Sequence, residues 1–541
     1  MAEGVFPHPR PQNEAVRPYE PSSDERARLD RAIAAIAGEQ RVMGAVINGE
    51  RLFEGQTTDV VMPHDHAHVL GRVHNTPADV VERAIEGALA AAPAWRAMDF
   101  EDRAAIFLRA AAMLAGPWRE RINAACMLGQ SKTAHQAEID AACELIDFFR
   151  FNVAFAREIH AHQPLSTASV RNRSDYRPLE GFVFAVAPFN FLSIAVNLAF
   201  APALMGNVIL WKPSTTGMIG AAHCLELLEA AGLPPGVIQL VPGDGPTQGN
   251  AVLASPHLAA IHFTGSTRTF KALWQGVASR IDTYRSFPRL VGETGGKDFI
   301  VFHESADLEV AAVAVARGAF EYQGQKCSAA SRIYVPNNRW AELEERVSAI
   351  VGEMKVGDVR DPANFLGAVI DRRAYEKIRA YQELAQSSAK VRFGGGGSDG
   401  TGYFIEPTLA LVDDPGHRLM NEEIFGPVLT AFTYDPNDWE QTLATVDSTS
   451  PYALTGAVFA RDRRVLRDAQ DRLRFSAGNF YLNDKPTGAV VGQQPFGGGR
   501  GSGTNDKAGA MWNLMRWVSP RSIKENLSPP SDWRYPFLAN P

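Results

Sequence analysis

The chain has 541 residues, a length that suggests roughly two to four domains at about 100–200 residues each. It carries 54 lysines and arginines against 61 aspartates and glutamates, so the net charge is −7 and no basic excess points to nucleic acid. Four cysteines in a chain of this length exclude a disulfide scaffold.

The N-terminal segment Met1–Pro21 is rich in proline and carries Glu3, Glu14 and Glu20. It lacks the charged start and the apolar core of a signal peptide, and its acidic residues are not typical of a mitochondrial transit peptide. We therefore expect an extended N-terminal arm on a cytoplasmic protein.

After this arm, the apolar pattern indicates helices first and then alternating strands and helices. Helices are predicted from Ser22 of a Ser-x-x-Glu capping box, from Thr76-Pro77, from Asp99 to Gly116 and from about Thr133 to His160. Apolar runs at Phe182–Ala187, Val208–Trp211, Val237–Val241 and Ile261–Phe263 then alternate with helical stretches at Gly217–Ala231 and Thr267–Ser279. Continuous apolar runs are typical of strands buried on both faces, so the alternation predicts a doubly wound parallel sheet. A second α/β unit is predicted from Phe299 to about residue 480.

One uncharged stretch, Gly181–Trp211, is long enough to raise the question of a membrane span. Its longest proline-free piece, Phe189–Ala201, is shorter than the ~20 residues that a spanning helix needs. We therefore interpret the stretch as buried strand, loop, helix and buried strand, and expect no membrane partner.

The sequence gives little support for a dinucleotide-binding fingerprint or for a histidine metal site. The G-x-G-x-x-G dinucleotide fingerprint is absent, and the nearest segment, Gly243–Gly249, has its third glycine one place late, which favours an ordinary loop. The histidines of His64–His68 are expected in a loop, as hydrogen-bonding side chains rather than a metal site.

Cys327 is the strongest candidate nucleophile among the four cysteines. It follows a helical run among small polar residues, and Lys326 is adjacent. A positive neighbour and backbone amides would lower the pKa of the thiol, and the thiolate is the reactive form. Cys126, Cys143 and Cys224 lie in runs of alanine, leucine and isoleucine, where small buried hydrophobic residues are expected.

A carboxylate and an amide occupy two further loops of interest. Glu293 stands in a glycine-rich turn after an apolar run, where it is either a general base or a plain turn residue. Asn190 follows a predicted strand, where its amide either stabilises an oxyanion or closes the loop.

Taken together, these segments resemble the ordered motif set of the aldehyde dehydrogenase superfamily. The six motifs are Pro188–Phe191, Trp211–Ser214, Phe263–Ser266, Glu293–Lys297, Gly324–Cys327 and Glu422–Pro427. Four more segments are similar to its Δ1-pyrroline-5-carboxylate dehydrogenase branch: Gln136–Glu144, Glu144–Asn152, Phe263–Lys271 and Gly492–Gly498, the last running on to Lys507. The resemblance covers nearly the whole chain after about residue 20.

The resemblance implies a role for each matched residue. Cys327 resembles the nucleophile, Asn190 the oxyanion-hole amide and Glu293 the base that activates the deacylating water. The positions matching NAD-binding residues are Lys212, Ser214, Gly265, Ser266, Glu423 and Phe425. The positions matching substrate-binding residues are Ser328, Gly488, Ala489, Phe191, Phe496 and Glu144. The chain departs from common relatives at Phe270, where many have glycine, at Ala489, often serine, and at Thr215, often acidic.

By resemblance, the fold class is α/β, with a Rossmann-like NAD domain, an α/β catalytic domain and a small β flap for oligomerisation. We expect the arm over residues 1–21, the NAD domain over 22–163 and 180–291, the catalytic domain over 292–505, and the flap and C-terminal tail over 164–179 and 506–541. No metal is expected.

The implied reaction is NAD-dependent oxidation of L-glutamate γ-semialdehyde to L-glutamate, the second step of proline catabolism. The implied partners are a second copy of the chain, in a homodimer or larger homo-oligomer, and a proline dehydrogenase. Two alternatives remain open. One is a dehydrogenase for another semialdehyde, and the other is a cysteine hydrolase or thioesterase that uses Cys327 without a redox step.

Overall fold

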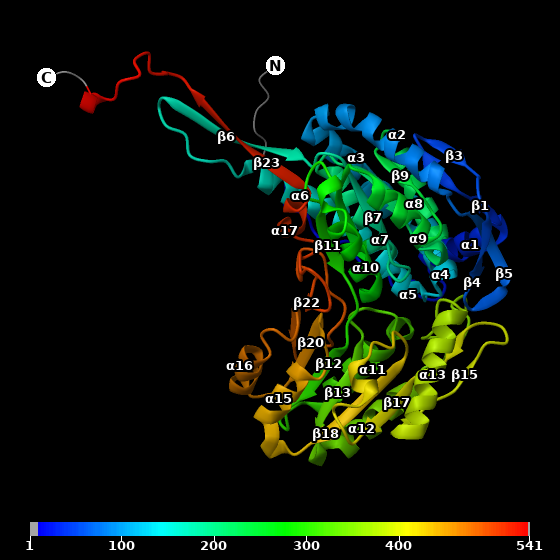
Figure 1. Cartoon of the computed structure of the whole chain (residues 1–541). Helices are drawn as coiled ribbons and strands as arrows, with labels where there is room; N and C mark the ends of the chain where they lie inside the picture. Colours follow the sequence, from blue (N-terminus) through cyan, green and yellow to red (C-terminus); the bar gives the residue numbers. More distant parts are fainter. Residues whose placement is uncertain (1–8, 539–541) are drawn as a thin grey trace.

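The computed structural model describes residues 9–538, which form two α/β halves and a projecting two-stranded ribbon (Figure 1). Met1–His8 of the expected arm and the last three residues of the expected tail lie outside the described residues.

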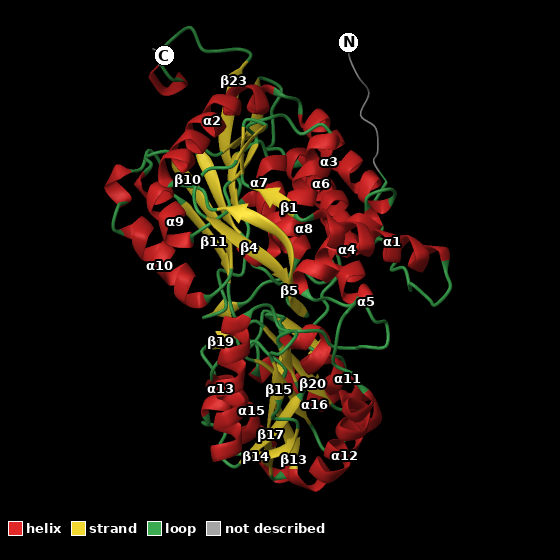
Figure 2. Cartoon of the chain, turned by 90° about the vertical axis from the view of Figure 1, so that its right-hand side faces the viewer, coloured by secondary structure: helices red, strands yellow, loops and turns green. Residues whose placement is uncertain are grey.

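The first half is built on a seven-stranded sheet in the order β11-β10-β7-β8-β9-β2-β3. The strands are β2 (Ala45–Ile47), β3 (Glu50–Leu52), β7 (Phe182–Val186), β8 (Val208–Lys212), β9 (Ile238–Leu240), β10 (Leu258–Thr264) and β11 (Arg289–Glu293). Strands β7 to β11 run parallel, and β2 and β3 join antiparallel at one edge. The central strands are almost fully buried because helices cover both faces of the sheet (Figure 2).

The helices of this half connect the strands, and some of them contribute residues to the cavity described below. They are α1 (Asp24–Glu39), α2 (Ala78–Ala97), α3 (Phe100–Ala115), α4 (Arg119–Gln130), α5 (Ala134–Ala137), the π-helix η1 (Glu138–Glu144), α6 (Leu145–Ala161), α7 (Leu192–Leu204), α8 (Met218–Ala230), α9 (Gly245–Ala254) and α10 (Thr267–Ala278). In the part of the chain that is described, no helix is both long and apolar enough to cross a membrane.

The second half repeats the architecture with the strand order β14-β17-β18-β13-β12-β20-β21. The strands are β12 (Asp298–Phe302), β13 (Ala330–Pro336), β14 (Lys390–Phe393), β17 (Thr408–Val412), β18 (Val428–Tyr434), β20 (Thr455–Phe459) and β21 (Asn479–Leu482), and only β14 is antiparallel. The helices are α11 (Leu308–Phe320), α12 (Asn337–Glu353), α13 (Arg372–Ser388), α14 (Arg418–Asn421), α15 (Trp439–Ser448) and α16 (Arg463–Arg472). Helix α17 (Met511–Met515) follows in the chain but packs against α6 of the first half (Figure 1).

The ribbon pairs β6 (Val170–Pro178) with β23 (Val518–Asn526) in an antiparallel ladder. It extends away from both halves, with the C-terminal end of the chain beyond it (Figure 1). Its side chains are half-buried or exposed, apart from Val518 at its base.

Several local expectations need correction. His64–His68 is not a loop, because Asp65 begins β5 (Asp65–His74), which pairs with β1 (Arg41–Met43) and β4 (Thr57–Met62). Gly243–Gly249 is not an ordinary loop either, because Asp244 caps α9, which starts at Gly245. The helix expected over Thr133–His160 contains the π-helical turns of η1.

Candidate functional site

A cavity of about 330 Å³ lies where the two halves meet. Cys327 and Glu293 both line it. So do all six residues expected to bind the substrate, which are Ser328, Gly488, Ala489, Phe191, Phe496 and Glu144. Residues far apart in the chain thus share one enclosed space of a volume that suits a small molecule.

Cys327 lies between α11 and β13, just after a sharp turn. Tyr322 and Gln323 adopt left-handed backbone conformations with φ of 51° and 56°. Burial, together with the charge of the nearby carboxylates, raises the pKa of the Cys327 thiol well above its usual value.

Lys326 does not lower the pKa of this thiol, contrary to the expectation from its adjacent position. Its Nζ lies 3.0 Å from Oε2 of Glu321, with which it forms a buried ion pair. The ammonium of Lys326 is therefore compensated by the Glu321 carboxylate rather than by a thiolate. Deprotonation of Cys327 therefore requires an acceptor in the cavity.

Glu293 ends β11 and lines the same cavity. Its Oε2 has no hydrogen-bond partner among the described residues, and burial raises the pKa of this carboxyl well above its usual value. Lys507 acts in the opposite direction through its charge. A raised pKa makes the ionised carboxylate a stronger proton acceptor, as a general base needs.

Asn190 lies between β7 and α7 and does not line the cavity, although its side chain is buried. Its Nδ2 donates a hydrogen bond to the carbonyl oxygen of Gln325, 3.0 Å away, two residues before Cys327. An amide group carries two N–H bonds, so one remains for an oxyanion beside the sulfur.

Two residues that the sequence did not single out hold this region together. Asp140 is fully buried and accepts hydrogen bonds from the backbone N–H groups of Leu192 and Ser193, from Ser193 Oγ at 2.6 Å and from Lys132 Nζ at 2.5 Å. The ammonium of Lys132 also lies 4.4 Å from the ring centroid of Phe191. The pair therefore caps α7 and fixes one of the two predicted substrate rings.

Hydrogen bonds and backbone conformation hold several of the predicted substrate-binding residues in place. Glu144 accepts a hydrogen bond from Ser193 Oγ, and burial raises the pKa of Glu144 to about 8. Ser328 Oγ lies 2.8 Å from Oγ1 of Thr487, which precedes Gly488. Gly488 has a φ of 93°, a backbone conformation that favours glycine.

The six residues expected to bind NAD lie outside this cavity, and four of them stand around the ends of β8 and β10. Lys212 is the last residue of β8, and Ser214 Oγ lies 3.0 Å from Oγ1 of Thr216. Gly265 precedes Ser266, which caps α10 by accepting a hydrogen bond from the Thr269 backbone. An ammonium and a helix N-terminus suit an anionic pyrophosphate, so these residues fit the cofactor.

Phe270 occupies the position where many relatives have glycine. Its ring stacks on Phe263 at a centroid distance of 5.4 Å, and a Cβ added at Gly292 would come within 2.2 Å of it. The larger side chain is therefore accommodated by a glycine on the neighbouring strand.

Glu423 and Phe425 lie at the other end of the expected cofactor site. The backbone N–H of Gly296 donates to Glu423 Oε1 at 3.0 Å, and a Cβ on Gly295 would lie 2.4 Å from the same oxygen. Phe425 has a φ of 61°, and its ring contacts Phe189 edge-on at 5.8 Å. A carboxylate beside an aromatic ring suits a ribose hydroxyl and a planar nicotinamide.

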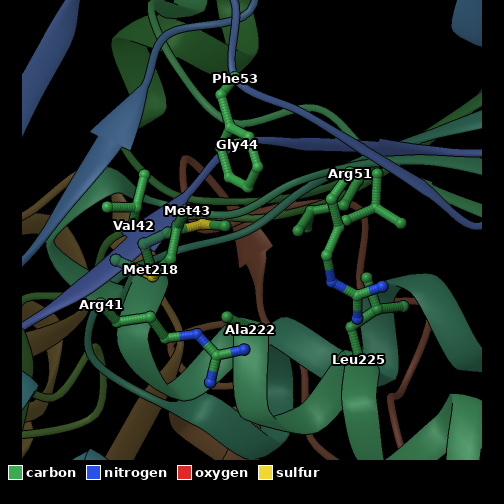
Figure 3. A pocket seen from close by; sticks show the side chains of 11 residues that line it. Arg41, Val42, Met43, Gly44, Arg51, Phe53, Met218, Ala222 and Leu225 are labelled. Carbon is green, nitrogen blue, oxygen red and sulfur yellow. The ribbon is translucent and has the colours of Figure 1, made fainter. Parts of the chain in front are cut away.

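A second cavity lies between β1, β3 and α8 and is lined by Arg41, Phe53 and Met218 among others (Figure 3). Its volume of about 40 Å³ is too small for a substrate or a nucleotide, and it holds none of the predicted site residues.

The profile of the aldehyde dehydrogenase family matches residues 52–523. The chain belongs to the aldehyde dehydrogenase family. This confirms the expected family and fold class and identifies the chain as an oxidoreductase. A Δ1-pyrroline-5-carboxylate dehydrogenase from Bos taurus is 48% identical over 97% of this chain and 94% of its own length. The structure of the Mycobacterium tuberculosis Δ1-pyrroline-5-carboxylate dehydrogenase bound with NAD is 52% identical, with a TM-score of 0.96 and full coverage of both chains.

A third relative is a longer protein. Proline utilization A from Bdellovibrio bacteriovorus is 28% identical, with a TM-score of 0.91, over 96% of this chain but only 54% of its own.

The comparisons contradict the expected cytoplasmic location, because the relative from Bos taurus is named mitochondrial. The expectation relied on the acidic residues of the arm. Glu14 is instead part of the folded structure, where its carboxylate pairs with Arg119 and Arg150 at 2.6 and 2.7 Å. The charge of Glu14 therefore has a structural role, and it is no argument against a targeting segment.

Proposed function

We propose that this aldehyde dehydrogenase oxidises L-glutamate γ-semialdehyde, formed from Δ1-pyrroline-5-carboxylate, to L-glutamate with NAD as the oxidant. This is the second step of proline catabolism. The observation that carries the proposal is the single cavity in which Cys327 and Glu293 meet Ser328, Gly488 and Ala489. The names of the relatives from Bos taurus and Mycobacterium tuberculosis support the same substrate.

The reaction begins when the Cys327 thiolate adds to the aldehyde carbon and forms a thiohemiacetal. Asn190 and the backbone N–H of Cys327 stabilise the oxyanion. NAD, held by the residues around Lys212 and Ser266, would supply the hydride acceptor that converts the thiohemiacetal of Cys327 into a thioester. Glu293 then removes a proton from water, whose oxygen attacks the thioester carbon and releases the carboxylic acid and the thiolate.

Substrate selection occurs at the opposite end of the cavity from the sulfur. Backbone N–H groups of Gly488 and Ala489 donate to the α-carboxylate, and the hydroxyl oxygen of Ser328 accepts from the α-ammonium. Phe191 and Phe496 enclose the aliphatic chain, and Glu144 lines the passage to Cys327. A plain dicarboxylic semialdehyde lacks the amine and leaves part of this anchor unpaired, which disfavours it.

A steady-state assay with Δ1-pyrroline-5-carboxylate and NAD tests the proposal. The wild type should reduce NAD, and Cys327→Ala should abolish turnover while retaining NAD binding. Cys224→Ala, at a fully buried side chain of α8, is the matched control and should retain activity. Hydrolysis of thioesters with no NAD reduction would favour the hydrolase alternative. Equal kcat/KM for semialdehydes with and without the α-amine would favour a different semialdehyde.

For assembly, we propose a homo-oligomer whose subunits contact one another through the β6–β23 ribbon. The ribbon projects from the body and offers an exposed strand edge, which favours pairing with another chain (Figure 1). Light scattering of the wild type and of a chain truncated before β23 tests this. A proline dehydrogenase partner is supported by the match to about half of the longer proline utilization A chain, and co-sedimentation tests it.

A further inference from the structure

The N-terminal arm, defined here as residues 9–20, has no regular secondary structure but is firmly attached to the first half. The backbone N–H of Arg17 and the hydroxyl of Tyr19 both donate to the buried carboxylate of Glu138, at 2.8 and 3.0 Å. Arg119 pairs with the same carboxylate and also binds Glu14. The arm is therefore a fixed part of the fold.

The arm also reaches the cavity that contains Cys327. Asn13, Glu14 and Val16 line it together with the substrate-binding residues. The arm thus forms one wall of the cavity, on the side of α6.

Asn13 connects two walls of this cavity. Its Nδ2 donates to Asp147 Oδ2 of α6 and to the carbonyl oxygen of Val491, both at 2.8 Å. Its Oδ1 accepts a hydrogen bond from Gln493 Nε2 at 2.9 Å. One side chain therefore bridges α6 and the loop that carries Gly488.

The loop of residues 488–494 depends on this bridge. Within it, the N–H groups of Gln493 and Gln494 donate to the carbonyl of Val490, so these bonds are local. Among the residues that the structure describes, every hydrogen bond from 488–494 to another part of the chain goes to Asn13. The loop also packs on α6, where Gly492 lies against the ring of Phe151. Its hydrogen bonds to the rest of the described chain, however, come from a residue some 480 positions away.

We propose that Asn13 is a positioning residue for the amino-acid end of the substrate. By holding Val491 and Gln493 against α6, it fixes the backbone N–H groups of Gly488 and Ala489 where they meet the α-carboxylate. Asn13 does not touch the reacting aldehyde, so its effect is confined to substrates that carry that carboxylate. The inference rests on the proposed function, since it assumes a substrate with an amino-acid end.

The test compares Asn13→Ala with Gln12→Ala, an adjacent exposed amide side chain in the same arm. Each variant is assayed with L-glutamate γ-semialdehyde and with propanal, which has an aldehyde but no carboxylate. Asn13→Ala should raise the KM for the semialdehyde at least about tenfold and leave kcat/KM for propanal and the KM for NAD within about twofold. Gln12→Ala should match the wild type on both substrates.

Gln493→Ala provides a second variant, because its exposed side chain makes one of the three bonds and its loss does not threaten folding. It should raise the same KM by a smaller factor. An unchanged semialdehyde KM in Asn13→Ala would overturn the inference, as would equal losses on both aldehydes, which indicate a merely structural role. A wild type that oxidises propanal but not the semialdehyde would instead refute the proposed function, and this inference with it.

Discussion

Replacing Asp140 by asparagine is expected to destabilise the first half severely, although the two side chains have nearly the same shape. Asp140 is the anionic partner of Lys132, and both side chains are almost completely buried. Asparagine keeps only one acceptor oxygen, whereas the N–H groups of Leu192 and Ser193 donate to the two different oxygens of Asp140. The change therefore removes the charge that compensates the buried ammonium and one of the two bonds to the N-terminus of α7.

The magnitude follows from that unpaired charge. Removing one partner of a buried ion pair typically costs ~3–5 kcal/mol, and the cap of α7 contributes about 1 kcal/mol more if its geometry is lost. The aromatic rings of Phe191 and Tyr322, 4.4 and 4.5 Å from Lys132 Nζ, offset only part of this cost. We expect a loss of ~3–5 kcal/mol in the free energy of unfolding.

Urea unfolding of Asp140→Asn, Lys132→Met and the double variant measures the effect as a double-mutant cycle. The double variant should recover at least half of the stability lost in Asp140→Asn, because it buries no unpaired charge. A loss below about 1 kcal/mol in Asp140→Asn would refute the reasoning, since that is the size of a neutral hydrogen bond alone.

Three further outcomes are expected. Phe496→Ala should raise the KM for the semialdehyde by the equivalent of ~1–3 kcal/mol while the KM for NAD is unchanged, because its backbone bonds to Ala508 remain; equal effects on both would contradict the proposal that Phe191 and Phe496 enclose the aliphatic chain of the substrate. Thr215→Glu should shift the kcat/KM ratio towards NAD over NADP by at least roughly tenfold, since a carboxylate repels the 2′-phosphate; an unchanged ratio would assign cofactor choice to another residue. Glu144→Gln should flatten the pH dependence of stability. The pKa of Glu144 is raised from 4.5 to about 8, so the wild type should lose stability as pH rises between these values. Urea midpoints at several pH values measure this, and parallel curves for both proteins would be the contrary result.

The sequence alone predicts the two α/β halves well, because their central strands are continuous apolar runs. Phe182–Val186 and Val208–Lys212 are buried along nearly their whole length, and this burial leaves a pattern that a single sequence reveals. In contrast, β5 reads Asp-His-Ala-His before its apolar part and lies half-exposed at the surface. Its apolar content is too low to separate it from a loop.

The sequence predicts which residues of the candidate site can react, because reactivity depends on residue type. It does not predict which neighbours each side chain contacts. Cys327 and Glu293 are recognised from their local motifs. The orientation of Lys326 towards Glu321 is set by a turn with left-handed residues, and sequence adjacency suggests the opposite. From the sequence, Asp140 reads as an ordinary polar residue of an alanine-rich helix. Its role is hidden because the groups that it binds lie some 50 residues further along the chain.

The β6–β23 ribbon has a consequence for the order of synthesis. One of its strands ends at Pro178, and its partner ends at Asn526, roughly 350 residues later in the chain. At a synthesis rate of about 5–20 residues per second, β6 is complete roughly 20–70 seconds before β23 and has no partner strand in that interval. Any assembly through this ribbon therefore requires that β23 has been synthesised, and a chain that stops before β23 cannot form it.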